Sequence, residues 1–294
     1  MRKTLFVMAF LIIVSQLRQA GGEVLSYRQG ETVLGEVRTY TVESEESLIE
    51  IARKFDLGYN EIADMNPSLD PFVPGREASV KIPTSWILPG TRLHDGIVIN
   101  LAELRLYYFY ELARRPFVLT FPIGIGSEGN DTPIGEYHII EKIENPAWHV
   151  PESIKKEKPY LPDVVPAGPD NPLGTHAMRL SLTTILIHGT NKPWGLGRRV
   201  SHGCIRLYPE DIPLLFSAVP NGTRVSIVRQ PVKAGMKSGR VYVEVHRVDF
   251  AHDVNYFEEA VQLLTKKDLI GRVNTKKLYY AVEEKKGIPV DVSD

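Results

Sequence analysis

The stretch SHGCIR, residues 201–206, contains Cys204, the only cysteine among the 294 residues of the chain. A single cysteine can form neither an internal disulfide nor a zinc site with several thiolates. Two uses remain for it, as a small buried hydrophobic side chain or as a reactive thiol. The histidines and arginines around this stretch favour the reactive thiol, because basic or positive neighbours lower the pKa of a cysteine.

Two histidines lie within reach of Cys204. His188 follows an apolar segment, residues 183–187, that we predict to be a strand, so it would project from the rim of a sheet. His202 stands two residues before Cys204, and in an extended segment both side chains would point to one face. Either histidine could act as the general base by reach alone. The alternative is a core cysteine accompanied by hydrogen-bonded surface histidines.

Length and composition describe an ordinary globular protein of about two domains. Apolar residues make up 43% of the chain and charged residues 24%, which is typical of a protein with a full hydrophobic core. The formal net charge is −1, and no long basic block is present in the sequence. Non-specific nucleic-acid binding is therefore not expected, since it requires a positive field that displaces counterions.

Residues 1–22 have the pattern of a signal peptide. A basic start precedes an apolar core from Leu5 to Val14, and small residues at 20–22 would suit cleavage. The core is too short to span a bilayer, which takes about 20 residues. We therefore predict export, followed by a polar linker at residues 23–37. An exported protein that keeps one free thiol is unusual, which again favours chemistry at the cysteine.

Residues 38–84 have the pattern of a compact β-α-α-β module. Short strands are predicted at 40–42 and 79–82. Between them, apolar residues recur from Leu48 to Phe55 at the spacing of one helix face. A second short helix is predicted to end before Asn66-Pro67, because the residue before proline avoids the helical region.

This module resembles LysM, a small carbohydrate-binding fold. The matching positions are Tyr40, Val42, Ser47-Leu48, Ile51-Ala52, Asn66, Gly75 and Ile82-Pro83. The resemblance implies binding of glycan that contains N-acetylglucosamine. LysM modules usually have Gly-Asp where this chain has Glu45-Glu46, so we expect the first loop to grip glycan less well. The alternative is a structural α/β cap on the next domain.

Residues 97–229 are predicted to form a mainly β domain. Strands are expected at 97–101, 104–110, 117–123, 135–141, 183–187 and 225–228. Long loops rather than helices connect them, which favours a β-sandwich over βαβ units, with one helix expected after Pro209. Residues 230–294 are predicted to form a small α+β unit. It would have a strand at 241–245 and two helices, one capped by Asp253 and one starting at Asn274.

The active-site candidates resemble the signature of the L,D-transpeptidases, also called the YkuD family. His188-Gly189-Thr190 followed by residues 201–206 carries the resemblance, which covers about residues 97–229. Residues 132–137 and 165–174 also look like family segments. The resemblance implies a YkuD-type β-sandwich as the catalytic domain. Periplasmic members of the family also combine it with LysM and a small C-terminal unit, which implies a periplasmic location.

The resemblance implies a role for each residue of the signature. Cys204 stands at the position of the family's nucleophile and His188 at that of its general base. The backbone carbonyl of Gly189 would hold His188 in the right tautomer, in place of the carboxylate of a serine-protease triad. Backbone N–H groups near Cys204 would stabilise the oxyanion. The residues that would shape the pocket are Ser201, His202 and Gly203.

Substrate contacts are expected from Arg206, Thr190 and Asn171. Family members often have Asn at the position of Arg206, although a subset has Arg. We expect Arg206, with Arg198 or Arg199, to favour the thiolate or to hold a carboxylate of the peptide stem. The alternative for the last two is simple solvation, as for most exposed loop arginines.

Two further patterns suggest other chemistries and are rejected. Residues 124–129 match G-x-G-x-x-G, but the turn-forming residues after them do not open the helix that a dinucleotide site needs. We interpret them as a tight connection between strands that borders the substrate groove.

A zinc site could be combined on paper from His149, His176, His188, His202 and Cys204. No H-x-x-x-H or H-E-x-x-H spacing supports it, so no metal or organic cofactor is expected.

The predicted enzyme is an L,D-transpeptidase of peptidoglycan, with tetrapeptide stems and glycan strands as partners. The Cys204 thiolate would attack the residue-three carbonyl, release D-alanine and pass the acyl group to an amine. A second stem would give a 3→3 crosslink, an outer-membrane lipoprotein would become attached to the wall, and water would give carboxypeptidase activity. Two alternatives remain: a cysteine peptidase or amidase of wall peptides, and a wall-binding protein in which the LysM module dominates.

Overall fold

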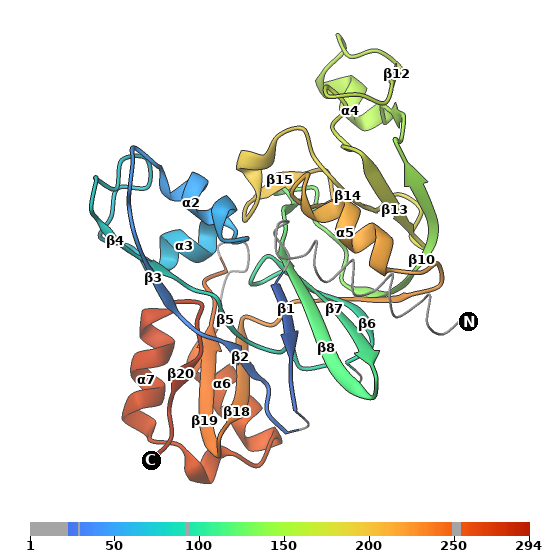
Figure 1. The fold of residues 1–294 in the computed structure, drawn as a ribbon. Helices are drawn as coiled ribbons and strands as arrows, with labels where there is room; N and C mark the ends of the chain where they lie inside the picture. Colours follow the sequence, from blue (N-terminus) through green and yellow to red (C-terminus); the bar gives the residue numbers. More distant parts are fainter. Residues whose placement is uncertain (1–22, 29, 92–93, 249–253) are drawn as a thin grey trace.

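The computed structural model describes residues 23–28, 30–91, 94–248 and 254–294. The expected signal peptide, residues 1–22, lies outside the described residues, as does the expected helix cap Asp253. Three units pack together in Figure 1, with the C-terminal unit below the other two. Within the described residues, no helix is both long and apolar enough to cross a membrane.

The central unit is built on one nine-stranded sheet. Its strands in spatial order are β1 (Glu23–Ser26), β8 (Arg115–Pro122), β7 (Arg105–Leu112), β6 (Gly96–Asn100), β17 (Arg224–Val228), β10 (Gly135–Glu144), β13 (His176–Leu180), β14 (Leu186–His188) and β16 (Ile205–Arg206). The pairs β6–β17 and β14–β16 are parallel, and the other neighbours are antiparallel. The mainly β fold predicted from the sequence is confirmed.

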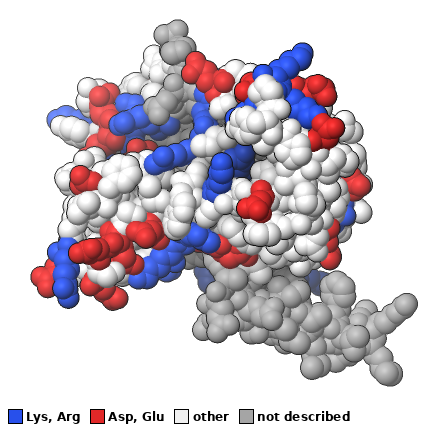
Figure 2. Space-filling view, turned by 90° about the horizontal axis from the view of Figure 1, so that it is seen from above, with Lys and Arg blue, Asp and Glu red and all other residues white. Residues whose placement is uncertain are grey.

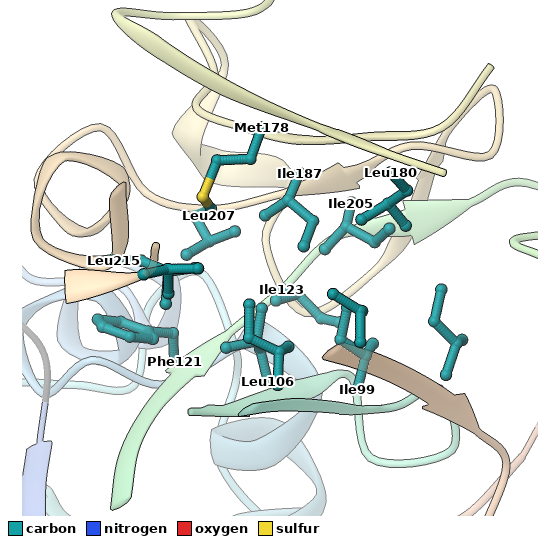
Figure 3. Packing of buried hydrophobic residues seen from close by; sticks show 14 of the residues in the cluster. Ile99, Leu106, Phe121, Ile123, Met178, Leu180, Ile187, Ile205, Leu207 and Leu215 are labelled. Atoms are coloured by element: carbon teal, nitrogen blue, oxygen red, sulfur yellow. The ribbon is translucent and has the colours of Figure 1, made fainter. Parts of the chain in front are cut away.

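The two ends of this sheet face each other across one hydrophobic core (Figure 3). Ile99, Leu106 and Phe121 on β6, β7 and β8 lie opposite Ile187 and Ile205 on β14 and β16, and all five are fully buried. Helix α5 (Asp211–Ala218) adds Leu215 to the same core. Each fully buried aliphatic side chain contributes about 1.5–3 kcal/mol, so the core holds the short strands β14 and β16 in place.

The LysM-like unit has the predicted β-α-α-β order. Its elements are β3 (Arg38–Thr41), α2 (Leu48–Lys54), α3 (Tyr59–Met65) and β4 (Ser79–Ile82). Helix α2 begins at a capping box, in which the Ser47 hydroxyl accepts from the Glu50 N–H and the Glu50 carboxylate accepts from the Ser47 N–H. Leu48 and Ile51 are completely buried, as their helical spacing predicts.

The prediction of a linker at residues 23–37 is wrong. Strand β1 extends the large sheet by pairing with β8, and β2 (Val33–Gly35) pairs with β5 (Ser85–Ile87) just after the LysM-like unit. These short strands have a weak sequence pattern because their partners, which are distant in the chain, supply the hydrogen bonds. The pairing of β2 with β5 therefore joins the two ends of the LysM-like unit, where the chain enters and leaves it.

The C-terminal unit is a three-stranded sheet covered by two helices (Figure 1). Its elements are β18 (Val232–Lys237), β19 (Arg240–Val245), α6 (Tyr256–Lys266), η2 (Ile270–Arg272), α7 (Thr275–Glu284) and β20 (Val290–Asp291). The side chain of Asn255 caps α6, and Asn274 caps α7 as predicted.

Several small elements precede the cysteine along the chain. They are β9 (Ile125–Gly126), β15 (Arg199–Ser201), β11 (Trp148–His149), α4 (Glu152–Glu157), β12 (Val164–Val165) and the 3-10 helix η1 (Pro193–Gly195). The G-x-G-x-x-G stretch contains β9, which pairs with β15, and the next element after it is a strand. The strand expected at 183–187 begins only at Leu186, because the Ile185 N–H donates to the Leu182 carbonyl in a turn.

Candidate active site

Strands β14 and β16 place the candidate catalytic residues on one face of the sheet. Their parallel register pairs Ile187 with Ile205 and His188 with Arg206. Both isoleucines belong to the hydrophobic core. Because side chains alternate between the faces of a strand, His188 and Arg206 lie on the opposite face. Cys204 directly precedes β16 and is bound by the backbone N–H of Leu186, the residue two before His188.

His188 is held as a neutral imidazole. Its ring is buried, and Nδ1 lies 2.6 Å from the carbonyl oxygen of Gly189. A carbonyl only accepts hydrogen bonds, so Nδ1 carries the proton and Nε2 has the lone pair. Burial and the charge of Arg206 lower the pKa of His188 to about 3, against the opposing effect of backbone carbonyls. A neutral ring is the form that can accept a proton from a thiol.

A tight turn presents Cys204. Gly203 has a φ of +97°, a left-handed conformation that favours glycine. The Ser201 hydroxyl donates to the Cys204 carbonyl at 2.6 Å, and the Thr132 hydroxyl donates to the Gly203 carbonyl at 2.9 Å. In a planar trans peptide the N–H points opposite to the C=O. The Thr132 contact therefore also fixes the direction of the Cys204 N–H.

The resting cysteine is a thiol. Its Sγ lies 3.8 Å from the Thr184 carbonyl oxygen. Burial raises the pKa of the Cys204 thiol, and the Leu186 N–H and the charges of Arg206 and Arg179 only partly oppose this. The thiolate expected from the sequence is thus not the resting form at neutral pH. A neutral thiol and a neutral imidazole must exchange their proton as the attack proceeds.

His202 does not share the face of Cys204. The left-handed Gly203 interrupts the extended segment on which that expectation depended. The His202 Nε2 instead lies 3.2 Å from a carboxylate oxygen of Glu157, at the end of α4. This contact ties the turn to the long segment between β10 and β13. His188 is therefore the histidine that the sheet places beside β16.

The arginines that were expected to favour the thiolate or to hold substrate differ in their surroundings. Arg206 is partly buried, and its Nε has no hydrogen-bond partner among the described residues. Arg198 instead lies over the ring of Tyr59, 3.9 Å from its centroid, and Arg199 pairs with Asp131. Sequence reasoning missed Arg179, which β13 places opposite Leu186. Figure 2 shows several basic side chains near the middle of the face seen from above, with an acidic side chain close by.

Asn171 holds a loop together. Its side chain is completely buried, and its amide group donates to the carbonyls of Pro146 and Pro166 at 2.8 and 3.0 Å. Its amide oxygen accepts from the Leu173 N–H at 2.8 Å. The structure therefore contradicts a direct substrate contact by Asn171. Thr190 is also buried, and its hydroxyl accepts a hydrogen bond from the Lys192 N–H in the loop that follows His188.

Thr132 is a further residue that the sequence analysis did not assign. Its hydroxyl accepts from the Gly126 N–H at 3.0 Å while donating to the Gly203 carbonyl. It thus links β9 to the turn that contains the cysteine. Thr132 begins one of the segments that resemble the family, and this was the available signal. The hydroxyl's two partners, however, are apparent only in three dimensions.

The LysM-like unit has a groove of about 640 Å³ between its two loops. Residues 43–46 line one side and residues 72–76 the other. Phe72 and Val73 are largely exposed there, which leaves an apolar surface available to a ligand. Glu45 and Glu46, the departures from the LysM pattern, lie directly in the groove.

The histidines considered for zinc do not gather. Among the described residues, the one cluster with metal-ligand spacing is Glu103, Glu244 and His246. The ammonium of Lys233 lies within this cluster and contacts both carboxylates. A cation from the chain itself thus already balances these acids.

Comparison with known proteins agrees with the resemblance. Residues 94–227 match the L,D-transpeptidase catalytic domain of the YkuD family, and residues 40–71 match the LysM domain. The chain is 40% identical to the probable L,D-transpeptidase YbiS of Escherichia coli over 83% of this chain and 81% of that protein. It is 35% identical to the probable L,D-transpeptidase ErfK/SrfK of Salmonella typhimurium over 99% of this chain and 97% of that protein.

The chain belongs to the YkuD family of L,D-transpeptidases. It is therefore an enzyme of this kind, with a LysM domain before its catalytic domain. Among solved structures, the catalytic domain of an Enterococcus faecium L,D-transpeptidase matches with 23% identity and a TM-score of 0.36, covering 47% of this chain and 99% of that one.

Proposed function

We propose that this L,D-transpeptidase acts on peptidoglycan, with Cys204 as its nucleophile and His188 as its general base. The proposal is supported by the pairing of β14 with β16, which sets His188 beside Arg206 on the face opposite the core, and by the Leu186 N–H on β14 that binds Cys204. The Gly189 carbonyl at Nδ1 leaves the lone pair of His188 on Nε2, ready to take the thiol proton.

Acylation begins when the Cys204 sulfur attacks the residue-three carbonyl of a tetrapeptide stem. The thiol proton moves to Nε2 of His188 as the carbon–sulfur bond forms. The carbonyl becomes an oxyanion, which the oriented N–H of Cys204 stabilises; one such donor contributes about 3–4 kcal/mol in comparable sites. His188 then protonates the leaving amine, the carbon–nitrogen bond breaks, and D-alanine departs to leave a thioester.

Deacylation reverses these steps with a new nucleophile. An amine attacks the thioester carbonyl, His188 accepts the amine proton, and the sulfur leaves as the thiol once it regains that proton. A diaminopimelate amine of a second stem gives a 3→3 crosslink, and a lysine of an outer-membrane lipoprotein gives protein attachment. The partly buried guanidinium of Arg206 is suited to a stem carboxylate, because its Nε has no hydrogen-bond partner among the described residues.

The LysM groove supplies the second contact with the wall. Its exposed Phe72 and Val73 offer apolar surface to the sugar faces of a glycan strand. Binding there raises the local concentration of stems near Cys204. We place the enzyme in the periplasm, where peptidoglycan is found, and residues 1–22 would direct its export.

Intact-mass spectrometry after incubation with a carbapenem tests the nucleophile and the base together. The wild type should gain one covalent adduct, and Cys204→Ala should gain none. His188→Ala should acylate at least 100-fold more slowly, since a general base contributes about 10²- to 10⁴-fold. His202→Ala, the matched control, should stay within about tenfold. An adduct in Cys204→Ala, or equal losses in the two histidine variants, would overturn these assignments.

Adding a stem amine or a lipoprotein peptide then identifies the acceptor, and hydrolysis alone would favour a carboxypeptidase.

A further inference from the structure

The LysM domain packs against the start of helix α5. The Arg53 guanidinium, near the end of α2, binds the Glu210 carboxylate at 2.7 and 2.9 Å, immediately before α5. The same guanidinium lies 5.2 Å from the ring centroid of Trp194 and 5.7 Å from that of Tyr208. The loop between the candidate base and nucleophile contains Trp194. A corner of the LysM domain therefore borders the catalytic segment.

Two buried carboxyl groups meet at this corner. Asp56 is 7% exposed and Asp211, the first residue of α5, is 0% exposed. Taken as ionised, none of their four carboxyl oxygens has a hydrogen-bond partner among the described residues. The two side chains are within hydrogen-bonding reach of each other once one of them is protonated. Two carboxylates in contact cannot both remain ionised, so the pair must hold a proton.

Asp56 is the group that keeps this proton. Burial raises the pKa of Asp56 well above its usual value, and the nearby charge of Asp211 raises it further. Burial also raises the pKa of Asp211, but the hydrogen bond from Asp56 opposes that rise. Asp56 is thus the donor and Asp211 the acceptor. The other charged or titratable groups that face the pair are Arg105, Arg53, Glu61, Glu210 and Tyr208.

The local cations do not replace the proton. Arg105 is buried and forms a bidentate pair with Glu61, with both contacts at 2.9 Å. Its remaining Nη2 contact is to the backbone carbonyl of Asp56 at 3.0 Å. Arg53 is committed to Glu210. Each guanidinium already has its own carboxylate, so the aspartate pair depends on hydrogen bonding within itself.

Contacts lead directly from this pair to His188. Ile212 follows Asp211 in the first turn of α5, and a Cβ added at Gly189 would lie 3.0 Å from its Cγ2. The first turn of α5 therefore packs on Gly189, whose carbonyl oxygen lies at Nδ1 of His188. Moving the start of α5 would move the group that sets the tautomer of the imidazole.

We propose that Asp56 and Asp211 share one proton and act as positioning residues for His188. They do so by keeping the first turn of α5 packed against Gly189. This proposal rests on the proposed role of His188 as the base. It makes the LysM domain part of the catalytic framework, in addition to any role in glycan binding. The coupling runs through packed groups that both domains contribute.

The experiment compares two substitutions in the full chain. Asp56→Asn supplies an amide N–H that donates to Asp211 without titrating, whereas Asp56→Ala supplies no donor. Nitrogen-15 NMR of labelled histidine reports the tautomer, with His188→Ala used to assign the signal. We expect the Nδ1–H tautomer to dominate in the wild type and in Asp56→Asn, and to be mixed with the Nε2–H tautomer in Asp56→Ala.

Kinetics provide the second readout, at a temperature at which every variant is folded. Asp56→Ala should lower kcat by about 10- to 100-fold with an unchanged KM, the size expected for a small misplacement of a catalytic group. Binding of a chitooligosaccharide, used as a short glycan ligand for the LysM groove, should not change. Asp56→Asn should restore kcat to within about threefold, and the matched control Glu36→Gln, at an exposed carboxylate, should match the wild type.

The outcomes separate this proposal from the proposed function. An unchanged tautomer and kcat in Asp56→Ala would overturn the positioning role while Cys204 acylation continued in the wild type. Loss of acylation in the wild type would refute the proposed function instead. If Asp56→Ala does not fold, Asp211→Ala, which removes the acceptor of the same proton, replaces it. That variant should show the same change of tautomer, and a normal tautomer there would also refute the proposal.

Discussion

The catalytic domain meets its two neighbours through buried charges, and the two junctions are completed in different ways. At the LysM junction, Arg105 pairs with Glu61 while Asp56 and Asp211 face each other without a cation of their own. At the C-terminal junction, the buried Lys233 ammonium contacts both Glu103 and Glu244, and His246 contacts the same two carboxylates. At the C-terminal junction a lysine cation balances the buried carboxylates, whereas at the LysM junction a proton does so.

The difference separates stability from catalysis. Among the described residues, the side-chain hydrogen bonds and ion pairs of Glu103, Glu244 and Lys233 involve neither α5 nor residues 186–189. The LysM junction instead abuts α5, which packs on Gly189. A change at the C-terminal junction should therefore alter the free energy of unfolding and leave the chemistry intact. A change at the LysM junction should alter the chemistry at a smaller cost in stability.

Removing the ammonium of the C-terminal junction should have the largest effect on stability. Lys233→Met leaves Glu103 and Glu244 buried without their counter-charge, a defect that costs about 3–5 kcal/mol. Denaturant unfolding measures this loss, and Lys276→Met on an exposed position of α7 should change stability by less than about 0.5 kcal/mol. Carbapenem acylation of the folded variant should stay near the wild-type rate. A large loss of acylation would contradict the separation of the two junctions.

The junctions should also respond to pH with opposite signs. The folded-state pKa values of Asp56 and Asp211 are raised, so the folded protein holds extra protons and the LysM junction weakens as pH rises above about 4. The pKa of Glu244 is lowered, so the C-terminal junction weakens only as pH falls below about 4. The raised pKa of Lys233 confines its loss to pH above about 10.

Hydrogen exchange between pH 5 and 9 measures this contrast, once the intrinsic pH dependence of exchange is subtracted. Protection around α2 and the start of α5 should fall as pH rises, while protection in β18 and β19 should stay level. Asp56→Asn should reduce the pH dependence of the LysM junction over this range, because the amide at residue 56 does not titrate and only Asp211 still does. Parallel curves for the two junctions would show that the aspartate pair does not hold a proton.

Much of the fold and of the candidate site could be predicted because the signals are local. Helix α2 follows from apolar residues at one face and from the Ser47 cap, and both depend on neighbours within a few residues. The candidate roles of Cys204 and His188 follow from a short motif, and the Gly189 carbonyl contact is present where the resemblance implied it.

The features that were missed depend on distant parts of the chain. Strand β1 is stabilised by β8, which no pattern within residues 23–37 can reveal. The positive φ of Gly203 redirects His202, and glycine in a sequence does not state which conformation it adopts. Strand pairing places Arg179 opposite Leu186, where its charge acts on the pKa of the Cys204 thiol. Asp56 and Asp211 meet only after two domains have docked. Partners of this kind require the three-dimensional structure.

The smallest expected effect tests whether the junction or the general stability of the LysM domain controls the chemistry. Ser47→Ala removes the capping box of α2 and should cost about 1 kcal/mol, since a lost N-cap typically costs about 0.5–2 kcal/mol. Ser47 lies at the other end of α2 from Arg53 and Asp56, so their contacts with Glu210 and Asp211 remain. Thermal unfolding should therefore report a less stable protein with an unchanged His188 tautomer and kcat. A fall in kcat in step with stability would mean that any loosening of the domain reaches His188, and the shared proton would then have no special part in positioning the base.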